Sequence, residues 1–177
     1  MDPKIGRKIG WIVGICALVA AGTQLSYVDW RPAVAPVDTR PLVILNHPQR
    51  DGRFRTPRRA DHRHNGIDFA ALLESPVRAV RGGRVAEVGT HPNRGLFIDL
   101  DHGDQLMSRY AHLRKTNVKK GDRVRQGELI GRVGKTGNAR DPSIPPYLHF
   151  EVRRDNSPID PLSLGLSAAW RKAGDTQ

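Results

Sequence analysis

Leu148-His149-Phe150-Glu151-Val152-Arg153 carries the clearest structural pattern of the chain, because apolar and polar residues alternate along it. Successive side chains of a β-strand point to opposite faces, so the leucine, the phenylalanine and the valine share one face, directed at a core. His149, Glu151 and Arg153 share the other face, which looks toward solvent or a groove. The stretch therefore predicts one half-buried strand with a histidine on its polar side.

Similar short runs, rich in β-branched residues, recur between turns marked by Gly, Asp and Asn. They predict strands at residues 77–80, 84–88, 96–100, 106–112, 129–133 and 148–153. Short strands at this spacing favour a mainly β fold, an antiparallel β-sandwich or barrel, over alternating β and α units. Two short helical pieces are also expected, one near residues 70–73 and a helical turn over residues 167–172.

The N-terminus carries an export pattern, in which Lys4, Arg7 and Lys8 precede an apolar run over residues 11–21. This layout is typical of a secretory signal peptide, with small residues available for cleavage. The alternative is a retained apolar helix that anchors the chain, because residues 22–28 could extend the run toward the roughly 20 residues that a membrane span needs. The sequence leaves both open. Both predict export to the periplasm or cell envelope, and the anchored form would be tethered to the inner membrane.

Composition divides the 177 residues into four parts. Residues 1–21 are the signal peptide or anchor, and residues 22–40, which hold two prolines and no periodic pattern, predict a linker. Residues 41–166 form the folded domain, long enough to bury a core, and residues 167–177 are a C-terminal tail. Cys16 is the only cysteine, so the folded part needs no disulfide, which suits an oxidising compartment.

The chain is strongly basic, with 29 Lys and Arg against 18 Asp and Glu and a net charge of +11. Six arginines lie between residues 50 and 63. We therefore predict that this segment, the basic loop, contacts an anionic wall polymer or membrane surface. Nucleic acid is excluded as a partner, because the chain carries an export pattern and the arginines are not interleaved with aromatic residues.

Three side chains form a candidate metal site. His64 and Asp68 lie four residues apart around Gly66, which allows a tight bend, and His149 lies on the polar face of its strand. Imidazole nitrogens and carboxylate oxygens are good ligands of zinc (Zn²⁺). Three protein ligands with a fourth position open are typical of a catalytic zinc site. His64, Asp68 and His149 are therefore predicted as ligands, and His112, which shares a face with Tyr110 in its predicted strand, is left for proton transfer.

These residues resemble the pattern of the lysostaphin-like (LytM-type) zinc metallo-endopeptidases. That pattern is H-x-x-x-D, matched by His64 and Asp68, then Y-x-H-L, matched by residues 110–113, then H-x-H, which ends at His149. The resemblance extends over residues 52–164. It implies a β-rich domain with a groove that hydrolyses peptide bonds in peptidoglycan, with His112 as an active-site histidine. In that family the position of Glu151 is not catalytic, so Glu151 is expected to be structural and paired with an arginine.

Tyr147 departs from this pattern, because the family usually has a second active-site histidine there. One interpretation is a catalytically weakened site that still binds metal. The domain would then bind the wall or act as a regulatory partner protein that controls another cell-wall hydrolase. In the other, the phenol hydroxyl donates a hydrogen bond to the developing oxyanion. Because all three predicted ligands are present, we predict an active zinc endopeptidase acting on peptidoglycan peptides, with the regulatory domain as the alternative.

Overall fold

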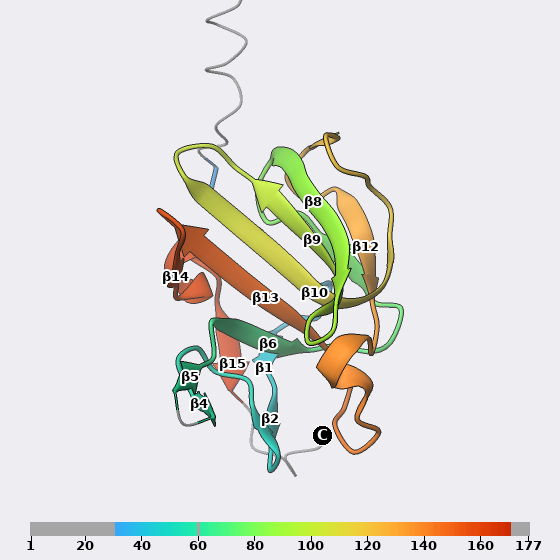
Figure 1. The fold of residues 1–177 in the computed structure, drawn as a ribbon. Helices are drawn as coiled ribbons and strands as arrows, with labels where there is room; N and C mark the ends of the chain where they lie inside the picture. Colours follow the sequence, from blue (N-terminus) through green and yellow to red (C-terminus); the bar gives the residue numbers. More distant parts are fainter. Residues whose placement is uncertain (1–30, 60, 171–177) are drawn as a thin grey trace, which may run out of the picture.

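Strands make up most of the structure, a computed structural model that describes residues 31–59 and 61–170 (Figure 1). In this part of the chain there is no α-helix, and the two helical pieces are short 3-10 helices, η1 (Gly137–Arg140) and η2 (Pro161–Leu164). The prediction of a mainly β fold is confirmed. The apolar N-terminal helix expected over residues 1–21 lies outside the described residues. Among those that are described, the structure contains no helix with the length and apolar character that crossing a membrane requires.

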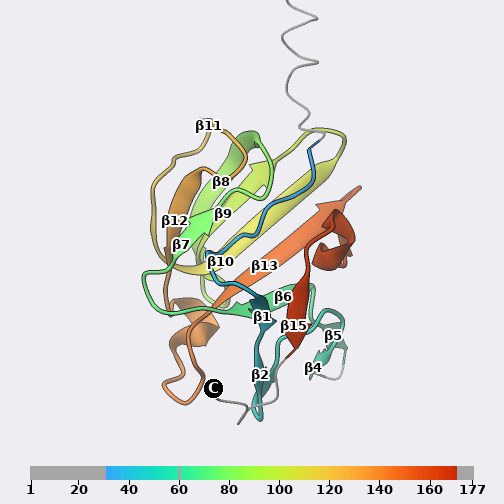
Figure 2. The ribbon, with the colours of Figure 1, turned by 180° about the vertical axis from the view of Figure 1, so that it is seen from behind.

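One large sheet organises the domain, and its central strands run in the order β8-β9-β10-β13-β6 (Figures 1 and 2). These are β8 (Gly83–His91), β9 (Gly95–Asp101), β10 (Leu106–Thr116), β13 (Tyr147–Arg154) and β6 (Gly66–Ala70), and all their pairings are antiparallel. Each of the six strands expected from the sequence overlaps a strand of the structure.

Shorter strands complete the sheet and form two small hairpins. In the sheet, β11 pairs with β8, β12 with β10 and β7, β14 with β13, and β1 with β6 and β15, only the β1–β15 pair being parallel. The hairpins are β2–β3 and β4–β5, and both lie in the basic loop or just before it. The bounds are β1 (Leu42–Ile44), β2 (Asn46–His47), β3 (Arg50–Asp51), β4 (Pro57–Arg59), β5 (His62–Arg63), β7 (Pro76–Arg78), β11 (Arg123–Val124), β12 (Leu129–Val133), β14 (Ser157–Ile159) and β15 (Ala168–Trp170).

Both helical predictions are wrong. Ala70 is the last residue of β6, and the chain then turns at residues 73–74, with Leu72 largely exposed. Residues 168–170 form β15, which pairs with β1 in the register Leu42↔Ala168. Pairing with a segment far away in the sequence thus overrides the local helical preference, as tertiary context commonly does.

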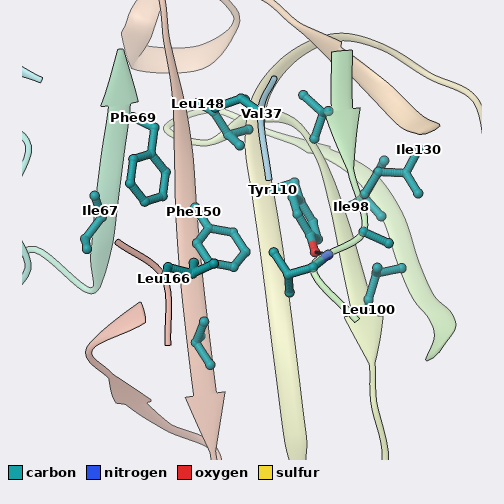
Figure 3. Packing of buried hydrophobic residues seen from close by; sticks show 14 of the residues in the cluster. Val37, Ile67, Phe69, Ile98, Leu100, Tyr110, Ile130, Leu148, Phe150 and Leu166 are labelled. Atoms are coloured by element: carbon teal, nitrogen blue, oxygen red, sulfur yellow. Dashed lines mark hydrogen bonds between the residues drawn. The ribbon is translucent and has the colours of Figure 1, made fainter. Parts of the chain in front are cut away.

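The core lies where the alternating stretch predicted it. Leu148, Phe150 and Val152 are fully buried, and Figure 3 shows Leu148 and Phe150 directed toward side chains of the neighbouring strands. The ring of Phe150 lies 5.2 Å from that of Tyr110 and 6.2 Å from that of Phe69, measured between centroids. Full burial of each such apolar side chain contributes about 1.5–3 kcal/mol, so β13 is held firmly with its polar face turned away from the core.

The end of the expected linker packs onto the domain. Val37 is fully buried and forms a bridge with Val77 of β7. Two backbone hydrogen bonds fix the same segment, from Val34 to the carbonyl of Val80 at 3.0 Å and from Arg78 to the carbonyl of Pro36 at 2.9 Å. The stretch 33–37 of the predicted 22–40 linker therefore belongs to the packed structure.

Candidate metal centre

The pairing of β6 with β13 positions two of the predicted ligands. Asp68 and His149 are direct partners in this antiparallel pair, and both point away from the core occupied by Phe69 and Phe150. Side chains opposite each other in such a pair have their Cβ atoms about 4.5–5.5 Å apart. The same alternation that buries the apolar residues thus brings the carboxylate and the imidazole together.

His64 reaches the same place from the turn between β5 and β6. Its amide donates to the carbonyl of Thr56 at 2.9 Å, and its carbonyl accepts from the amide of Arg55 at 2.9 Å. These two bonds tie the turn to the segment before β4. His64, Asp68 and His149 are all buried.

The ligand atoms of the three side chains converge. His64 Nε2 lies 3.0 Å from His149 Nδ1, His149 Nδ1 lies 2.7 Å from Asp68 Oδ1, and His64 Nε2 lies 3.2 Å from Asp68 Oδ1. Ligands held at about 2.0–2.1 Å from zinc in a tetrahedral arrangement are about 3.3 Å apart. The cluster fits zinc in donor type, and its spacing needs only a small expansion to hold the ion.

Hydrogen bonds on the far side of each imidazole set the tautomers. His64 Nδ1 lies 2.8 Å from the carbonyl oxygen of Arg53, and His149 Nε2 lies 2.9 Å from Glu151 Oε1. Carbonyl and carboxylate oxygens only accept, so these two nitrogens carry protons, and the other nitrogen of each ring faces the cluster, where its deprotonated form can bind a metal ion. Outer partners of this kind orient metal-binding histidines.

Glu151 therefore does more than pair with an arginine. It is buried beside His149, and its second oxygen lies 3.6 Å from Arg109 Nη1 and 3.4 Å from Arg153 Nε. Arg109 is itself held by Asp99. The expected arginine pairing is present, but the contact with His149 was not predicted. The spacing of two residues along one strand face was the available signal.

Charges in the cluster stabilise its ionised form. Burial opposes ionisation of Asp68, yet His64 and His149 hold the pKa of its carboxyl well below the usual value. Burial would lower the pKa of His149, but hydrogen bonds to Asp68 and Glu151 outweigh it and raise that pKa to about 9. Burial would raise the pKa of Glu151, but the hydrogen bond and the charge of His149 bring it down to about 2.

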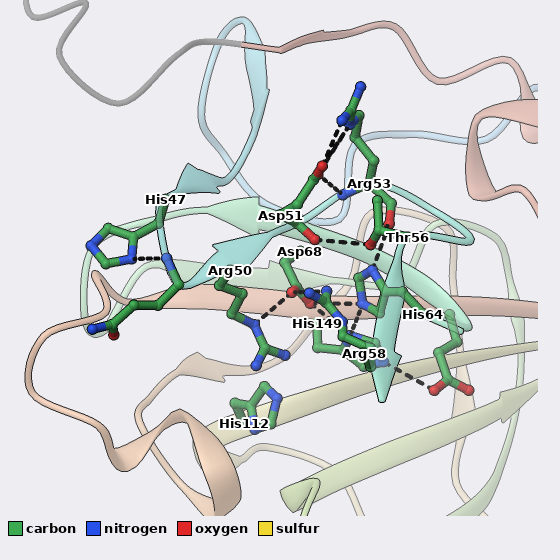
Figure 4. A network of polar contacts seen from close by, with 12 residues as sticks. His47, Arg50, Asp51, Arg53, Thr56, Arg58, His64, Asp68, His112 and His149 are labelled. Carbon is green, nitrogen blue, oxygen red and sulfur yellow. Dashed lines mark hydrogen bonds and ion pairs between the residues drawn. The ribbon is translucent and has the colours of Figure 1, made fainter. Parts of the chain in front are cut away.

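Two arginines also contact the other oxygen of Asp68. Arg50 Nε lies 2.8 Å and Arg58 Nη2 lies 3.0 Å from Asp68 Oδ2 (Figure 4).

His112 enters the site through an irregularity in β10. The pairing of β10 with β9 shifts register between Tyr110 and Leu113, and His112 has a left-handed φ of 63°. The side chain of Tyr110 lies in the core, where its hydroxyl accepts the amide of Val80 at 2.9 Å, whereas His112 lies 5.8 Å from His149 between ring centroids. The prediction that Tyr110 and His112 share a face is wrong, because the bulge changes the alternation.

The protonation state of His112 is well defined. Its Nδ1 lies 2.9 Å from the carbonyl oxygen of Thr136, so this nitrogen donates and Nε2 keeps its lone pair. Burial, and to a smaller extent repulsion from His149, lowers the pKa of His112 to about 3. His112 is therefore a neutral imidazole at pH 7.

Tyr147, the first residue of β13, lies against His112, with the rings edge to face and 5.0 Å between centroids. The guanidinium of Arg50 lies over the Tyr147 ring, with its carbon 4.6 Å from the ring centroid. Among the residues that the structure describes, no hydrogen-bond partner reaches the buried Tyr147 hydroxyl. Burial and the charge of Asp68 raise its pKa, so the hydroxyl stays protonated and is free to donate.

Comparison with known proteins agrees with this geometry. The model of Peptidase family M23 matches residues 62–161. The chain is 39% identical over 106 residues to the peptidoglycan DD-endopeptidase ShyB of Vibrio cholerae, covering 60% of this chain and 24% of that protein. It is 34% identical over 134 residues to ShyA of the same organism, covering 76% and 30%. The chain thus spans less than a third of the length of these two relatives.

Solved structures show the same fold. A zinc-containing peptidase from Vibrio cholerae is 32% identical with a TM-score of 0.62, covering 80% of this chain and 41% of that one. The catalytic domain of lysostaphin from Staphylococcus simulans is 34% identical with a TM-score of 0.56, covering 64% and 89%. The resemblance inferred from the motifs is confirmed. Since the family match covers more than half of the residues and contains the whole cluster, the chain belongs to Peptidase family M23.

Proposed function

We propose that this chain is a zinc-dependent endopeptidase that hydrolyses peptide bonds in peptidoglycan. One observation carries the proposal: the buried donor atoms of His64, Asp68 and His149 converge within 3.2 Å of one another beside His112. Membership of Peptidase family M23 supports the reaction class. The names of the two Vibrio cholerae relatives, both peptidoglycan DD-endopeptidases, support the substrate.

Zinc held by these three side chains would act as a Lewis acid toward the scissile carbonyl and would activate the attacking water. The protein positions the ligands for this task. Asp68 is fixed by its pairing with His149 in the sheet, and the histidine lone pairs are directed inward by Arg53 and Glu151. Such a preorganised set needs little rearrangement when the substrate arrives.

His112 is the residue proposed to assist the attacking water. Its Nε2 keeps a lone pair at pH 7, so it would accept a hydrogen bond from the attacking water and orient it while the proton passes on to the nitrogen of the leaving amine. Thr136 holds the ring by accepting from Nδ1 at 2.9 Å, so the imidazole keeps one orientation throughout.

Tyr147 is the proposed donor to the developing oxyanion. Its hydroxyl is protonated, buried and without a partner in the described part of the chain, so donation would satisfy an otherwise unpaired group. A donor of this kind contributes about 3–4 kcal/mol to the transition state. The tyrosine would thus replace one function of the histidine that the family usually has there, and the active enzyme is favoured over the weakened regulatory domain.

The test is peptide release from purified peptidoglycan by the full chain. Soluble peptides should appear with zinc, should disappear with a chelator, and should return when zinc is added back. A His149→Ala preparation is the matched control for contaminating hydrolases. If wild type and control release equal amounts, the proposed activity is wrong.

Export is part of the same proposal. The basic and apolar pattern of residues 1–21 favours a signal peptide or an inner-membrane anchor, and the basic loop favours an anionic wall polymer or membrane surface as a further contact. A relative named as a lipoprotein NlpD/LppB homolog, from Pseudomonas aeruginosa and 37% identical over 100 residues, supports a place in the cell envelope. Cell fractionation with N-terminal mass analysis distinguishes a cleaved signal from a retained anchor, and a full-length cytoplasmic protein would contradict both.

A further inference from the structure

Two guanidinium groups converge on a single oxygen at the metal site. Arg50 Nε and Arg58 Nη2 both contact Asp68 Oδ2, at 2.8 Å and 3.0 Å, while Oδ1 faces the two histidines. The arginine side chains are 13% and 18% exposed and Asp68 is fully buried. One arginine would suffice to orient the carboxylate, so the second needs a different explanation.

Both arginines have guanidinium N–H groups that do not contact Asp68. Within the described residues, the contact with Asp68 is the one hydrogen bond that either guanidinium makes, so Arg50 Nη1 and Nη2 and Arg58 Nε and Nη1 are not used. Figure 4 shows the Arg50 guanidinium between Asp68 and His112, and the same group stacks on Tyr147 at 4.6 Å. The spare donors therefore border the space where the scissile bond is proposed to lie.

The charges around Asp68 do not balance. Two guanidinium groups face one carboxylate, and bound zinc would add two more positive charges. Glu151 does not compensate, because it already faces His149, Arg109 and Arg153. A peptide bond is neutral, so the scissile group alone leaves an excess of positive charge at a largely buried site. Guanidinium groups pair with carboxylates and phosphates through charge-assisted hydrogen bonds, and a peptide substrate supplies carboxylates.

We propose that Arg50 and Arg58 form a carboxylate subsite that selects peptides carrying a free carboxylate next to the scissile bond. The inference rests on the proposed peptidase function and specifies its substrate class. The carboxylate can come from two sources: the C-terminus of the residue after the bond, or the side chain of that residue. Either would place an anion against the donors that Asp68 leaves unused.

Equilibrium binding to the metal-free full chain tests the subsite without relying on turnover. The probes are acetyl-D-Ala-D-Ala with a free C-terminus, its C-terminal amide, and acetyl-D-Ala-D-Glu-amide, which carries only a side-chain carboxylate. NMR titration gives the affinity of each. At least one carboxylate probe should bind about tenfold more tightly than the neutral amide, the factor for one charge-assisted hydrogen bond, and the probe preferred identifies the source.

Arg50→Gln and Arg58→Gln should each reduce the preference for a carboxylate probe to less than twofold. Arg50→Lys keeps the positive charge but loses the planar pair of N–H donors, so it should retain part of the preference. Arg63→Gln is the matched control, because this exposed arginine of the same basic loop donates to the carbonyl of Arg55 and makes no ion pair with Asp68 in the described part of the chain. Its preference should equal that of wild type.

Three results would overturn the subsite: no preference for a carboxylate in wild type, a preference that survives both glutamine variants, or an equal loss in Arg63→Gln. Zinc affinity is measured in parallel. If the arginines only orient Asp68, the glutamine variants lose zinc affinity and keep the carboxylate preference. Peptidoglycan cleavage without any carboxylate preference would refute the subsite and leave the proposed function standing.

Discussion

Glu151→Gln is the sharpest test of how the metal centre is built. The glutamine amide oxygen can still accept from His149 Nε2 over the 2.9 Å contact, so the ring orientation is retained while the charge is removed. A hydrogen bond to a charged group contributes about 1.5–3 kcal/mol and a neutral one about 0.5–1.5. The difference, about 1.4 kcal/mol, predicts a loss of about tenfold in zinc affinity. Glu151→Ala also leaves Nε2 unpaired, and we expect a loss of about a hundredfold.

The pH of the assay decides how much of this loss is visible. Zinc must displace a proton from His149, whose pKa of about 9 in the metal-free protein makes wild-type affinity rise with pH up to that value. Because Glu151 helps to raise that pKa, its removal weakens the proton competition below pH 9. We therefore expect the full tenfold loss at pH 9 and a smaller one at pH 7, measured by competition with a chelating dye.

Glu74→Gln is the matched control, because Glu74 is 48% exposed and pairs with Arg114. Its zinc affinity should equal that of wild type at both pH values. If Glu151→Gln also binds zinc as wild type does at pH 9, with an unchanged melting temperature, then the carboxylate does not tune His149 and our account of the site is wrong.

Three further predictions concern the site and the sheet. His149→Ala should reduce bound zinc from one equivalent to nearly none by elemental analysis, and undiminished zinc would rule out the ligand set. Tyr147→Phe should keep zinc and slow turnover by about 10²–10³-fold, whereas full activity would refute the donor role. Gly66→Ala should lower stability by about 3 kcal/mol, because the new Cβ would lie 2.2 Å from the carbonyl oxygen of Phe150; an unchanged melting temperature would contradict the close approach of β6 to β13.

The sequence predicted the elements whose local pattern agrees with their burial. β13 alternates strictly, and its core face and polar face were both assigned correctly. β12 was predicted at its observed bounds, residues 129–133, because it is a short β-branched run between turns. The three side chains that cluster were selected by residue type and motif, since ligand chemistry admits few amino acids.

Other features depend on contacts that no local pattern contains. β6 also alternates, but its buried Asp68 and initial Gly66 conceal the strand until its pairing with β13 is known. The bulge that redirects His112 depends on how β10 meets both β9 and β12. Likewise, Arg50 and Arg58 were assigned from the sequence only to the basic loop expected to contact an anionic polymer or surface, and only the fold brings them to Asp68.

The direct pairing of Asp68 with His149 links the assembly of the proposed ligand set to correct folding. If β6 slipped by one residue along β13, Ile67 or Phe69 would stand opposite His149, and the carboxylate would turn into the core. A chain with that error could not assemble the ligand set, whatever its overall strand content. If these side chains hold zinc as proposed, zinc loading of a newly folded chain therefore reports on strand alignment at the centre of the sheet.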